Sequence, residues 1–125
     1  MKDFKDLEVF VQARLLVKDV YRMTSTFPKE EVYGITNQIR RSAVSILSNI
    51  AEGMGRQHKA DTVQFLFVSR GSLYELEAQI LISFDLGYIT ENNHELLNRQ
   101  IQTCRKLLQG FINYIKESDH VKYSR

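Results

Sequence analysis

The chain contains a single proline, Pro28, and none of residues 29–125 is a proline. Proline fixes φ and lacks a backbone N–H, so it interrupts helices, whereas turn-rich β folds use it freely. Apolar residues make up 43% of the 125 residues and charged residues 26%, values that exclude a disordered tail or a low-complexity chain. A long proline-free run of ordinary hydrophobicity therefore favours long helices in one domain.

Cysteine usage and the start of the chain indicate the cellular compartment. Cys104 is the only cysteine, so no disulfide can form within the chain, and no apolar signal region follows Met1. No window approaches the ~20 consecutive apolar residues that span a bilayer. We therefore expect a cytosolic protein that makes no membrane contact.

Apolar residues recur with helical spacing in four segments, and the first two meet near Pro28. The first segment starts at Leu7 and ends in a hydroxyl-rich turn. Pro28 suits the first position of the second helix. Gly34 favours a break in that helix, after which Thr36 can cap a new start. Gly53 is a candidate left-handed cap at its end.

The third segment is apolar around nearly its whole circumference, so we expect it to be buried on all sides. Asp61 and Gln64 have the spacing of a capping box at its start, Gly87 can end it, and Thr90 can cap the fourth helix. The fourth helix carries apolar residues at alternating spacings of four and three, typical of helices that pack at a shallow angle. These residues are Leu97, Ile101, Cys104, Leu108, Phe111 and Ile115.

The connections between the four predicted helices are short, which makes successive helices antiparallel. We therefore predict an all-α, up-down-up-down four-helix bundle over residues 1–117. Residues 118–125 lack a pattern and are predicted to be a frayed tail.

Four separated motifs resemble the signature of a known family. They are Phe27-Pro28 with Glu30, the run from Gln38 to Arg56, the run from Gly71 to Glu77, and Leu86-Gly87-Tyr88-Ile89. In this order they resemble the bacterial family of four-helix-bundle proteins encoded in intervening sequences of large-subunit (23S) ribosomal RNA genes. Leu47 stands where that family usually has a proline, which predicts a straighter helix.

The resemblance implies a left-handed up-and-down bundle that assembles with copies of itself into a ring, a homopentamer. It implies no established activity and no cofactor. A related bundle, the accessory protein of diversity-generating retroelements, is similar in fold and assembly and works with a reverse transcriptase and nucleic acid. Similarity at the level of the fold transfers weakly to function.

A second stripe of helical period lies beside the apolar stripe of the second helix and combines small with hydrogen-bonding side chains. It consists of Gln38, Arg41, Ser42, Ser45, Asn49 and Glu52, and Ser69 and Ser72 are matching small residues on the third helix. Such side chains let another helix approach closely and form hydrogen bonds across the contact. Two interpretations stay open: a tightly packed helix pair within the chain, or a contact between copies.

Glu52 stands out in this stripe because it lies just before the predicted helix end. A carboxylate there opposes the helix dipole, at a cost of about 0.3–1 kcal/mol. Our hypothesis is that Glu52 accepts hydrogen bonds from Arg41 or Arg56 of another chain. An exposed, unpaired Glu52 is the alternative.

The net charge of +2 hides a strong partition along the chain. Residues 71–98 carry five acidic and no basic groups, between the basic stretches 38–70 and 99–125. This partition suits complementary surfaces between copies, or a basic rim that binds RNA or DNA. The candidate nucleic-acid contacts, expected around the turn between the second and third helices, are Arg40, Arg56, His58, Lys59 and Arg70. A merely solvated loop is the alternative, because no known nucleic-acid-binding motif is present.

No residue pattern favours an enzyme. His58, His94 and His120 lack the spacing of a metal site, and Cys104 occupies a helix position typical of a small buried side chain. Gly53-Met54-Gly55 is too short for a phosphate-binding loop and lacks its lysine. We therefore predict a non-enzymatic, self-associating protein without metal or cofactor, with nucleic-acid binding as the alternative function.

Overall fold

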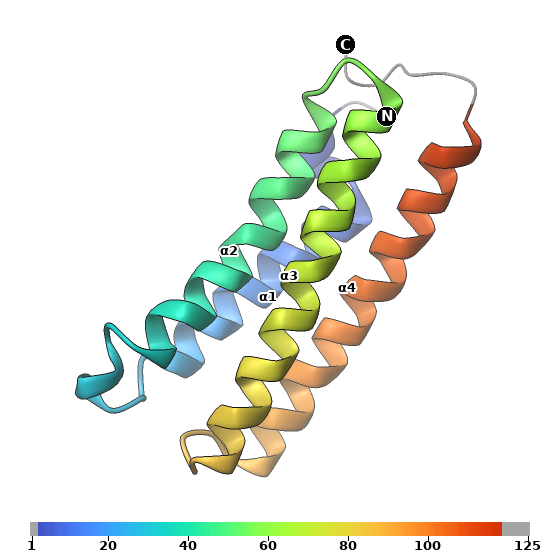
Figure 1. The fold of residues 1–125 in the computed structure, drawn as a ribbon. Helices are drawn as coiled ribbons and strands as arrows, with labels where there is room; N and C mark the ends of the chain where they lie inside the picture. Colours follow the sequence, from blue (N-terminus) through green and yellow to red (C-terminus); the bar gives the residue numbers. More distant parts are fainter. Residues whose placement is uncertain (1–2, 119–125) are drawn as a thin grey trace.

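The computed structural model describes residues 3–118, which form helices and connecting turns. Four long helices follow one another: α1 (Glu8–Thr24), α2 (Ile35–Met54), α3 (Lys59–Asp85) and α4 (Glu91–Glu117). Short 3-10 helices, η1 (Phe4–Asp6) and η2 (Lys29–Glu31), precede α1 and α2. The long helices alternate in direction, and each contacts its neighbours in sequence while α1 also contacts α4 (Figure 1). The predicted up-down-up-down four-helix bundle is confirmed for the described residues.

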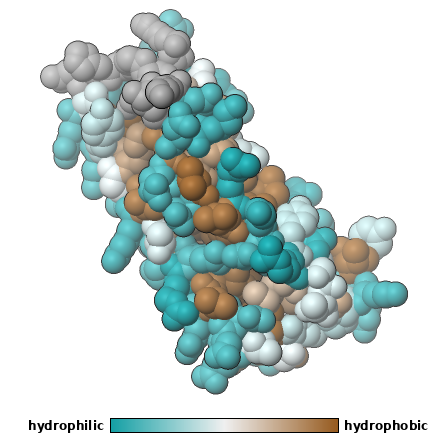
Figure 2. Space-filling view, turned by 180° about the vertical axis from the view of Figure 1, so that it is seen from behind, coloured by the Kyte–Doolittle hydropathy of each residue, from teal (hydrophilic) through white to brown (hydrophobic). Residues whose placement is uncertain are grey.

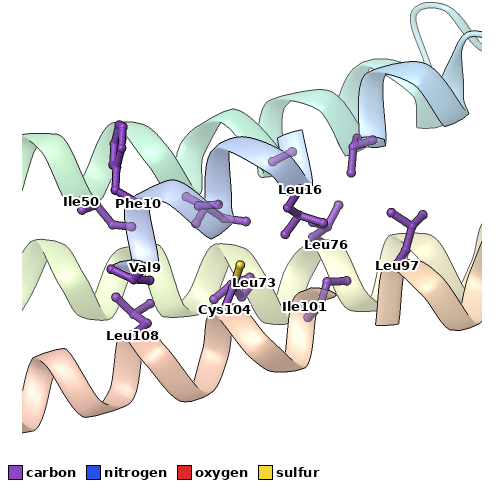
Figure 3. Close-up of a cluster of buried hydrophobic side chains, with 14 of the residues drawn as sticks. Val9, Phe10, Leu16, Ile50, Leu73, Leu76, Leu97, Ile101, Cys104 and Leu108 are labelled. Atoms are coloured by element: carbon purple, nitrogen blue, oxygen red, sulfur yellow. The ribbon is translucent and has the colours of Figure 1, made fainter. Parts of the chain in front are cut away.

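The core lies along the axis of the bundle and receives side chains from all four long helices (Figure 3). Leu16, Ile50, Leu76 and Leu108 are completely buried there, and burial of one such side chain contributes roughly 1.5–3 kcal/mol. In α4 the predicted core position Phe111 is only half-buried, and Ile112 takes its place. The reason is that an α-helix has 3.6 residues per turn and drifts away from a strict seven-residue repeat.

The start of α2 differs from the prediction. The break at Gly34 is confirmed, but Pro28 precedes η2 and not α2 itself, and Thr36 lies buried inside the helix and does not cap it. Gly34 occupies the capping position, and the backbone N–H of Ile35 donates to Oε1 of Glu31 at 3.3 Å. The carboxylate of Glu31, in the preceding turn, therefore accepts a hydrogen bond at the start of α2, the role predicted for the hydroxyl of Thr36. The helix dipole favours a negative charge at this end.

Gly53 is not a left-handed cap, because α2 continues through it to Met54. Gly53 is buried, and a Cβ at this position would lie 3.1 Å from both the Cβ of Phe65 and the carbonyl oxygen of Thr62. Absence of a side chain thus allows α3 to approach, which is a second use of glycine that the sequence pattern did not distinguish. Within residues 3–118, the one positive φ (81°) belongs to Gly87, which ends α3 as predicted.

The start of α3 is earlier than predicted, and the start of α4 is confirmed. Helix α3 begins at Lys59, so Asp61 lies within its first turn and the capping box with Gln64 is not formed. Thr90 caps α4, since its Oγ1 accepts from the backbone N–H of Asn93 at 3.2 Å. Of the predicted tail, Ser118 is described, whereas residues 119–125, with His120, lie outside the described residues.

Helix α3 is not buried on all sides within the chain, contrary to the prediction. Its exposed apolar side chains are Val68, Tyr74, Leu81, Ile82 and Leu86 at its C-terminal cap, with exposed fractions of 44–54%. Helix α3 lies at one corner of the bundle and contacts α2 on one side and α4 on the other, so no other long helix covers its outer face within residues 3–118.

Candidate functional site

The α2–α3 interface is built from small residues and hydroxyl groups. Ser69 Oγ donates to the carbonyl oxygen of Ile46 at 2.9 Å, and the hydroxyls of Ser45 and Ser72 lie 2.8 Å apart. In the last turn of α2, the carbonyl oxygen of Gly53 accepts from Thr62 Oγ1 of α3 at 2.8 Å. These bonds satisfy buried hydroxyls across a close helix contact. For Ser42, Ser45, Ser69 and Ser72, which lie in or beside this interface, the interpretation as a packed pair within the chain is therefore supported.

The remaining residues of the predicted stripe lie further out. The side-chain amide of Asn49 donates to the carbonyl oxygen of Ser45 at 2.9 Å and stays half-buried. Gln38, Arg41 and Glu52 are exposed on the outside of α2. The stripe is thus divided into an inner part that joins α2 to α3 and an outer part that faces solvent.

Glu52 has a partner in its own chain. Its Oε2 lies 2.8 Å from a guanidinium nitrogen of Arg56, and the two side chains are 54% and 43% exposed. The guanidinium of Arg56 also lies over the ring of Phe65, 4.6 Å from its centroid. The alternative of an unpaired Glu52 is wrong. An exposed pair at this spacing contributes only about 0.3–0.5 kcal/mol, enough to offset the unfavourable helix dipole.

Three of the five predicted nucleic-acid contacts lie together at the α2–α3 turn: Arg56, His58 and Lys59. His58 precedes α3, but its side chain does not cap the helix. Lys59 Nζ donates to the carbonyl oxygens of Lys116 at 3.2 Å and Ser118 at 2.5 Å. The ammonium group thereby neutralises the negative end of α4, so it has a structural role at the same place.

The other two predicted contacts do not lie at this turn, so the prediction of one five-residue cluster is wrong. Nε of Arg40 donates to Thr24 Oγ1 at 2.8 Å, and its guanidinium lies over the ring of Tyr21 near the opposite end of the bundle. Arg70 donates to Oε1 of Gln109 at 2.7 Å, which joins α3 to α4. Residues close in sequence to a turn are far from it in a helix, since each residue advances the helix by about 1.5 Å.

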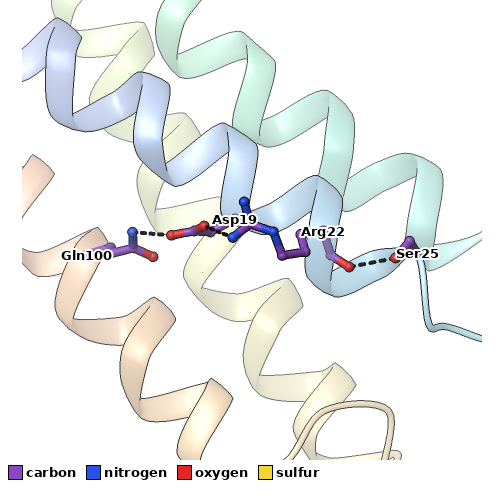
Figure 4. Close-up of polar contacts among 4 residues, drawn as sticks. All are labelled: Asp19, Arg22, Ser25 and Gln100. Carbon is purple, nitrogen blue, oxygen red and sulfur yellow. Dashed lines mark hydrogen bonds and ion pairs between the residues drawn. The ribbon is translucent and has the colours of Figure 1, made fainter.

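A groove of about 590 Å³ separates α1 from α4, and no local sequence pattern predicted it. The carboxylate of Asp19 lies at its edge. It accepts a hydrogen bond from the side-chain amide of Gln100 of α4 at 2.7 Å and forms an ion pair with Arg22 at 2.7 Å (Figure 4). The lining includes Met23, Leu96, Leu97, Arg99, Gln100 and Thr103. This interface is therefore joined by polar side chains at its edge and is open between them.

Two rows of exposed residues follow α3 and α4, and the first half of the α4 row (Leu96, Arg99 and Thr103) also lines the groove beside α1. The α3 stripe consists of Val68, Gly71, Glu75, Ala78, Ile82 and Leu86, and the α4 stripe consists of Leu96, Arg99, Thr103, Lys106, Gly110 and Tyr114. Every one of these residues is exposed. Figure 2 shows the opposite side of the bundle from Figure 1, the side on which α1 lies, and there too apolar side chains reach the surface between polar ones. The apolar members at the ends of both stripes are 44–59% exposed within residues 3–118.

Each stripe contains a glycine that packing within the chain does not explain. A Cβ built on Gly71 or Gly110 would have no other group within 4 Å. Glycine inside a helix costs roughly 0.5–1 kcal/mol relative to alanine. Gly53 offsets that cost by a close contact, whereas Gly71 and Gly110 have open space around them.

Comparison with known proteins agrees with the four motifs. The family model for the 23S rRNA-intervening sequence protein matches residues 5–110, which include α1, α2, α3 and most of α4. The chain belongs to this family. No curated protein matches the chain. The resemblance carried by the motifs is therefore confirmed.

A solved structure shares the fold of this chain. It is the crystal structure of a protein with unknown function from the S23 ribosomal protein family of Bacteroides thetaiotaomicron. The two chains are 25% identical with a TM-score of 0.80, over 87% of this chain and 98% of that one. Neither the family description nor this structure names an activity, so the function of this family member is argued from its own surfaces.

The cysteine and one histidine of this chain pack against other side chains of the bundle. Cys104 is buried in the core, and burial raises the pKa of its thiol to about 11, so it stays protonated and weakly nucleophilic at neutral pH. His94 stacks on Phe84 with 4.5 Å between ring centroids. Across residues 3–118, His, Cys, Asp and Glu nowhere form a group of three or more suited to a metal ion. In the same range, no helix is both long and apolar enough to cross a membrane.

Proposed function

We propose that this protein is a non-enzymatic, self-associating four-helix bundle of the cytosol that acts as a homo-oligomer. The observation that carries the proposal is the apolar outer face of α3, where Val68, Ile82 and Leu86 are 44–53% exposed in the single chain. Monomeric soluble proteins expose single apolar residues freely, but rows of them mark interaction sites.

The free energy gained by burying apolar surface favours a partner for the outer face of α3. Completing the burial of a large apolar side chain contributes about 25 cal/mol for each Å² removed from water. Because the residues of the α3 stripe follow one another along a single helix face, another helix can cover them all at once. A second copy of the same chain offers a helix of the same length and kind. The family resemblance suggests five copies in a ring, and we adopt that number for the assembly.

Light scattering coupled to size exclusion tests the proposal. At micromolar concentration we expect a mass that is a multiple of the 14.6 kDa chain, five-fold for the proposed ring. Dilution into the nanomolar range should shift the mass toward the monomer. A stable monomer at tens of micromolar would overturn self-association, and another defined multiple would overturn the ring of five alone.

Nucleic-acid binding at the α2–α3 turn is the second candidate function. It is supported by the grouping of Arg56, His58 and Lys59 with Lys116, whose backbone Lys59 contacts. Repetition of this basic cluster in an oligomer would multiply a modest charge, so binding would be multivalent and sensitive to salt.

Fluorescence anisotropy with a mixed-sequence single-stranded RNA tests this second function at low salt. We expect Arg56→Glu to weaken binding, since it reverses a charge at the turn. Lys18→Glu is the matched control, because Lys18 is an exposed cation on α1 away from the turn. Absence of binding by the wild type, or equal binding by the two variants, would exclude the turn as a nucleic-acid site.

A further inference from the structure

We propose that copies of this chain associate through two different surfaces, with the α3 stripe of one copy packed against the α4 stripe of the next. This inference rests on the proposed self-association and specifies its geometry. The partner is thus a second copy, and each copy uses one surface to receive a neighbour and the other to bind the next.

The two stripes cannot satisfy one another within a single chain. Helices α3 and α4 are neighbours, but they meet through other residues: Arg70 with Gln109, and Glu77 with Arg105 at 2.8 Å. On a helix with 3.6 residues per turn, these residues point more than a quarter turn away from the exposed stripes. Both stripes therefore remain available to a neighbouring molecule.

The stripes have matching spacings. Successive members of the α3 stripe are three, four, three, four and four residues apart, and successive members of the α4 stripe have the same spacings. Each row therefore follows a single face of its own helix over about five turns. Each has a glycine with open space around it, Gly71 in one and Gly110 in the other. Close approach of two helices at these glycines would use the space that nothing in the chain fills.

Charge complementarity favours an antiparallel alignment. If Gly71 lies opposite Gly110 and the helices run in opposite directions, Glu75 falls opposite Lys106. The same register places Val68 beside Tyr114. The acidic member belongs to residues 71–98, which contain no basic group, and the α4 stripe contains cations and no acid. Opposite charges that meet between apolar contacts fix a register.

The opposite directions of α3 and α4 also agree with copies that lie side by side in the same orientation. Helices α3 and α4 run in opposite directions in the bundle (Figure 1). Copies in the same orientation therefore present α3 and α4 to one another in the antiparallel sense. A contact between two unlike surfaces is heterologous, and it generates a closed ring when the rotation closes and an open filament when it does not.

Mixing two blocked variants tests the two-surface geometry. Ile82→Arg places a charge in the α3 stripe, and Gly110→Arg places one in the α4 stripe. Each variant alone should be monomeric in light scattering. Mixed in equal amounts, they should form a complex of two copies and nothing larger, because each retains the surface that the other has lost. Leu81→Arg is the matched control, since Leu81 is exposed on α3 but lies outside the stripe, and it should assemble like the wild type.

Exchange of charges is a second measurement that does not depend on bulky substitutions. Glu75→Lys and Lys106→Glu should each weaken assembly by roughly tenfold or more, and the double variant in one chain should recover it. Assembly by Ile82→Arg alone, failure of the mixed variants to combine, or no recovery in the double variant would overturn the inference while the wild type still assembles. A monomeric wild type would overturn the proposed self-association itself, so the two failures are distinguishable.

Discussion

The α2–α3 and α1–α4 interfaces lie on opposite sides of the bundle and are built from different kinds of side chain. Across the first, Gly53 lets the helices approach closely, and the hydroxyls of Thr62 and Ser69 donate to the backbone of the opposing helix. Across the second, the bond from Gln100 to Asp19 joins the edges of a groove of about 590 Å³. Small residues shorten the distance between helices, whereas long polar side chains connect helices that remain apart.

We expect the close α2–α3 interface to contribute more to the stability of the bundle, and the open α1–α4 interface to be more accessible to other molecules. A close interface without spare volume resists any added atom, because protein interiors are packed as densely as organic crystals. An open interface accepts new side-chain volume and presents apolar surface to other molecules. We therefore expect the same substitution to have different, even opposite, effects on the two sides.

The largest expected difference comes from adding a leucine side chain to each interface. Ser69→Leu overpacks a completely buried position and removes the bond to Ile46, so it should lower the free energy of unfolding by about 3 kcal/mol. Thr103→Leu adds comparable volume beside the groove and should change it by less than about 0.5 kcal/mol. Urea unfolding of protein kept monomeric, as checked by light scattering, measures both. Equal losses would mean that the α1–α4 side is packed as closely as the α2–α3 side.

Glycine-to-alanine substitutions should have opposite effects on stability in the close α2–α3 interface and on the exposed face of α4. Gly53→Ala brings a Cβ to 3.1 Å from Phe65 and from the backbone of Thr62, and a net loss of about 1 kcal/mol is expected after the gain in helix propensity. Gly110→Ala meets nothing within 4 Å and should stabilise the monomer by about 0.5–1 kcal/mol. The same urea experiment measures the pair. A stabilising Gly53→Ala would show that α3 can move away without cost.

Loss of the bond between α1 and α4 should let that side open locally. Gln100→Ala removes the donor to Asp19, which should cost about 1 kcal/mol. Cys104 reports the opening, because its buried thiol reacts only when the helices separate. A thiol reagent at pH 8 should then react with Cys104 about fivefold faster than in the wild type.

Gln102→Ala is the matched control for this experiment, because Gln102 lies on the α3 side of the same helix and makes only a long bond of 3.4 Å to Glu77. It should leave the reaction rate of Cys104 unchanged. Reaction in every variant at the rate of global unfolding would contradict local opening of the α1–α4 side.

Much of the fold followed from local patterns. The four helical periods, the end of α3 at Gly87 and the cap at Thr90 all depend on residues within one or two turns of each other. Features of this kind depend on residues that are close together in the sequence, so the sequence alone predicts them. The Ser45–Ser72 contact agrees with one of the two interpretations of the small-residue stripe, a tightly packed helix pair within the chain.

Most of the errors share a physical cause, since they depended on a contact with another element that the local pattern does not show. Gly53 reads as a cap until Phe65 is known to lie against it. Thr36 reads as a cap until Glu31 is found to take that role. Arg40 and Arg70 were assigned to a turn by sequence distance, but each bonds to a helix that folds back beside it. The groove at Asp19 depends on Gln100, 81 positions later, and no local pattern indicates it.

The smallest expected effect concerns Arg22, which pairs with Asp19 at 2.7 Å while its side chain stays 72% exposed. Arg22→Ala should cost no more than about 0.5 kcal/mol, because solvent screens an exposed ion pair and Gln100 still bonds to Asp19. Ser45→Ala, on the α2–α3 side, should cost about 1 kcal/mol through its half-buried bond to Ser72. Raising the salt concentration to about 1 M should abolish the first effect and leave the second, since the screening length falls to about 3 Å. An Arg22→Ala effect that exceeds the Ser45→Ala effect would mean that the bond network at the edge of the groove holds the bundle together as firmly as close packing does.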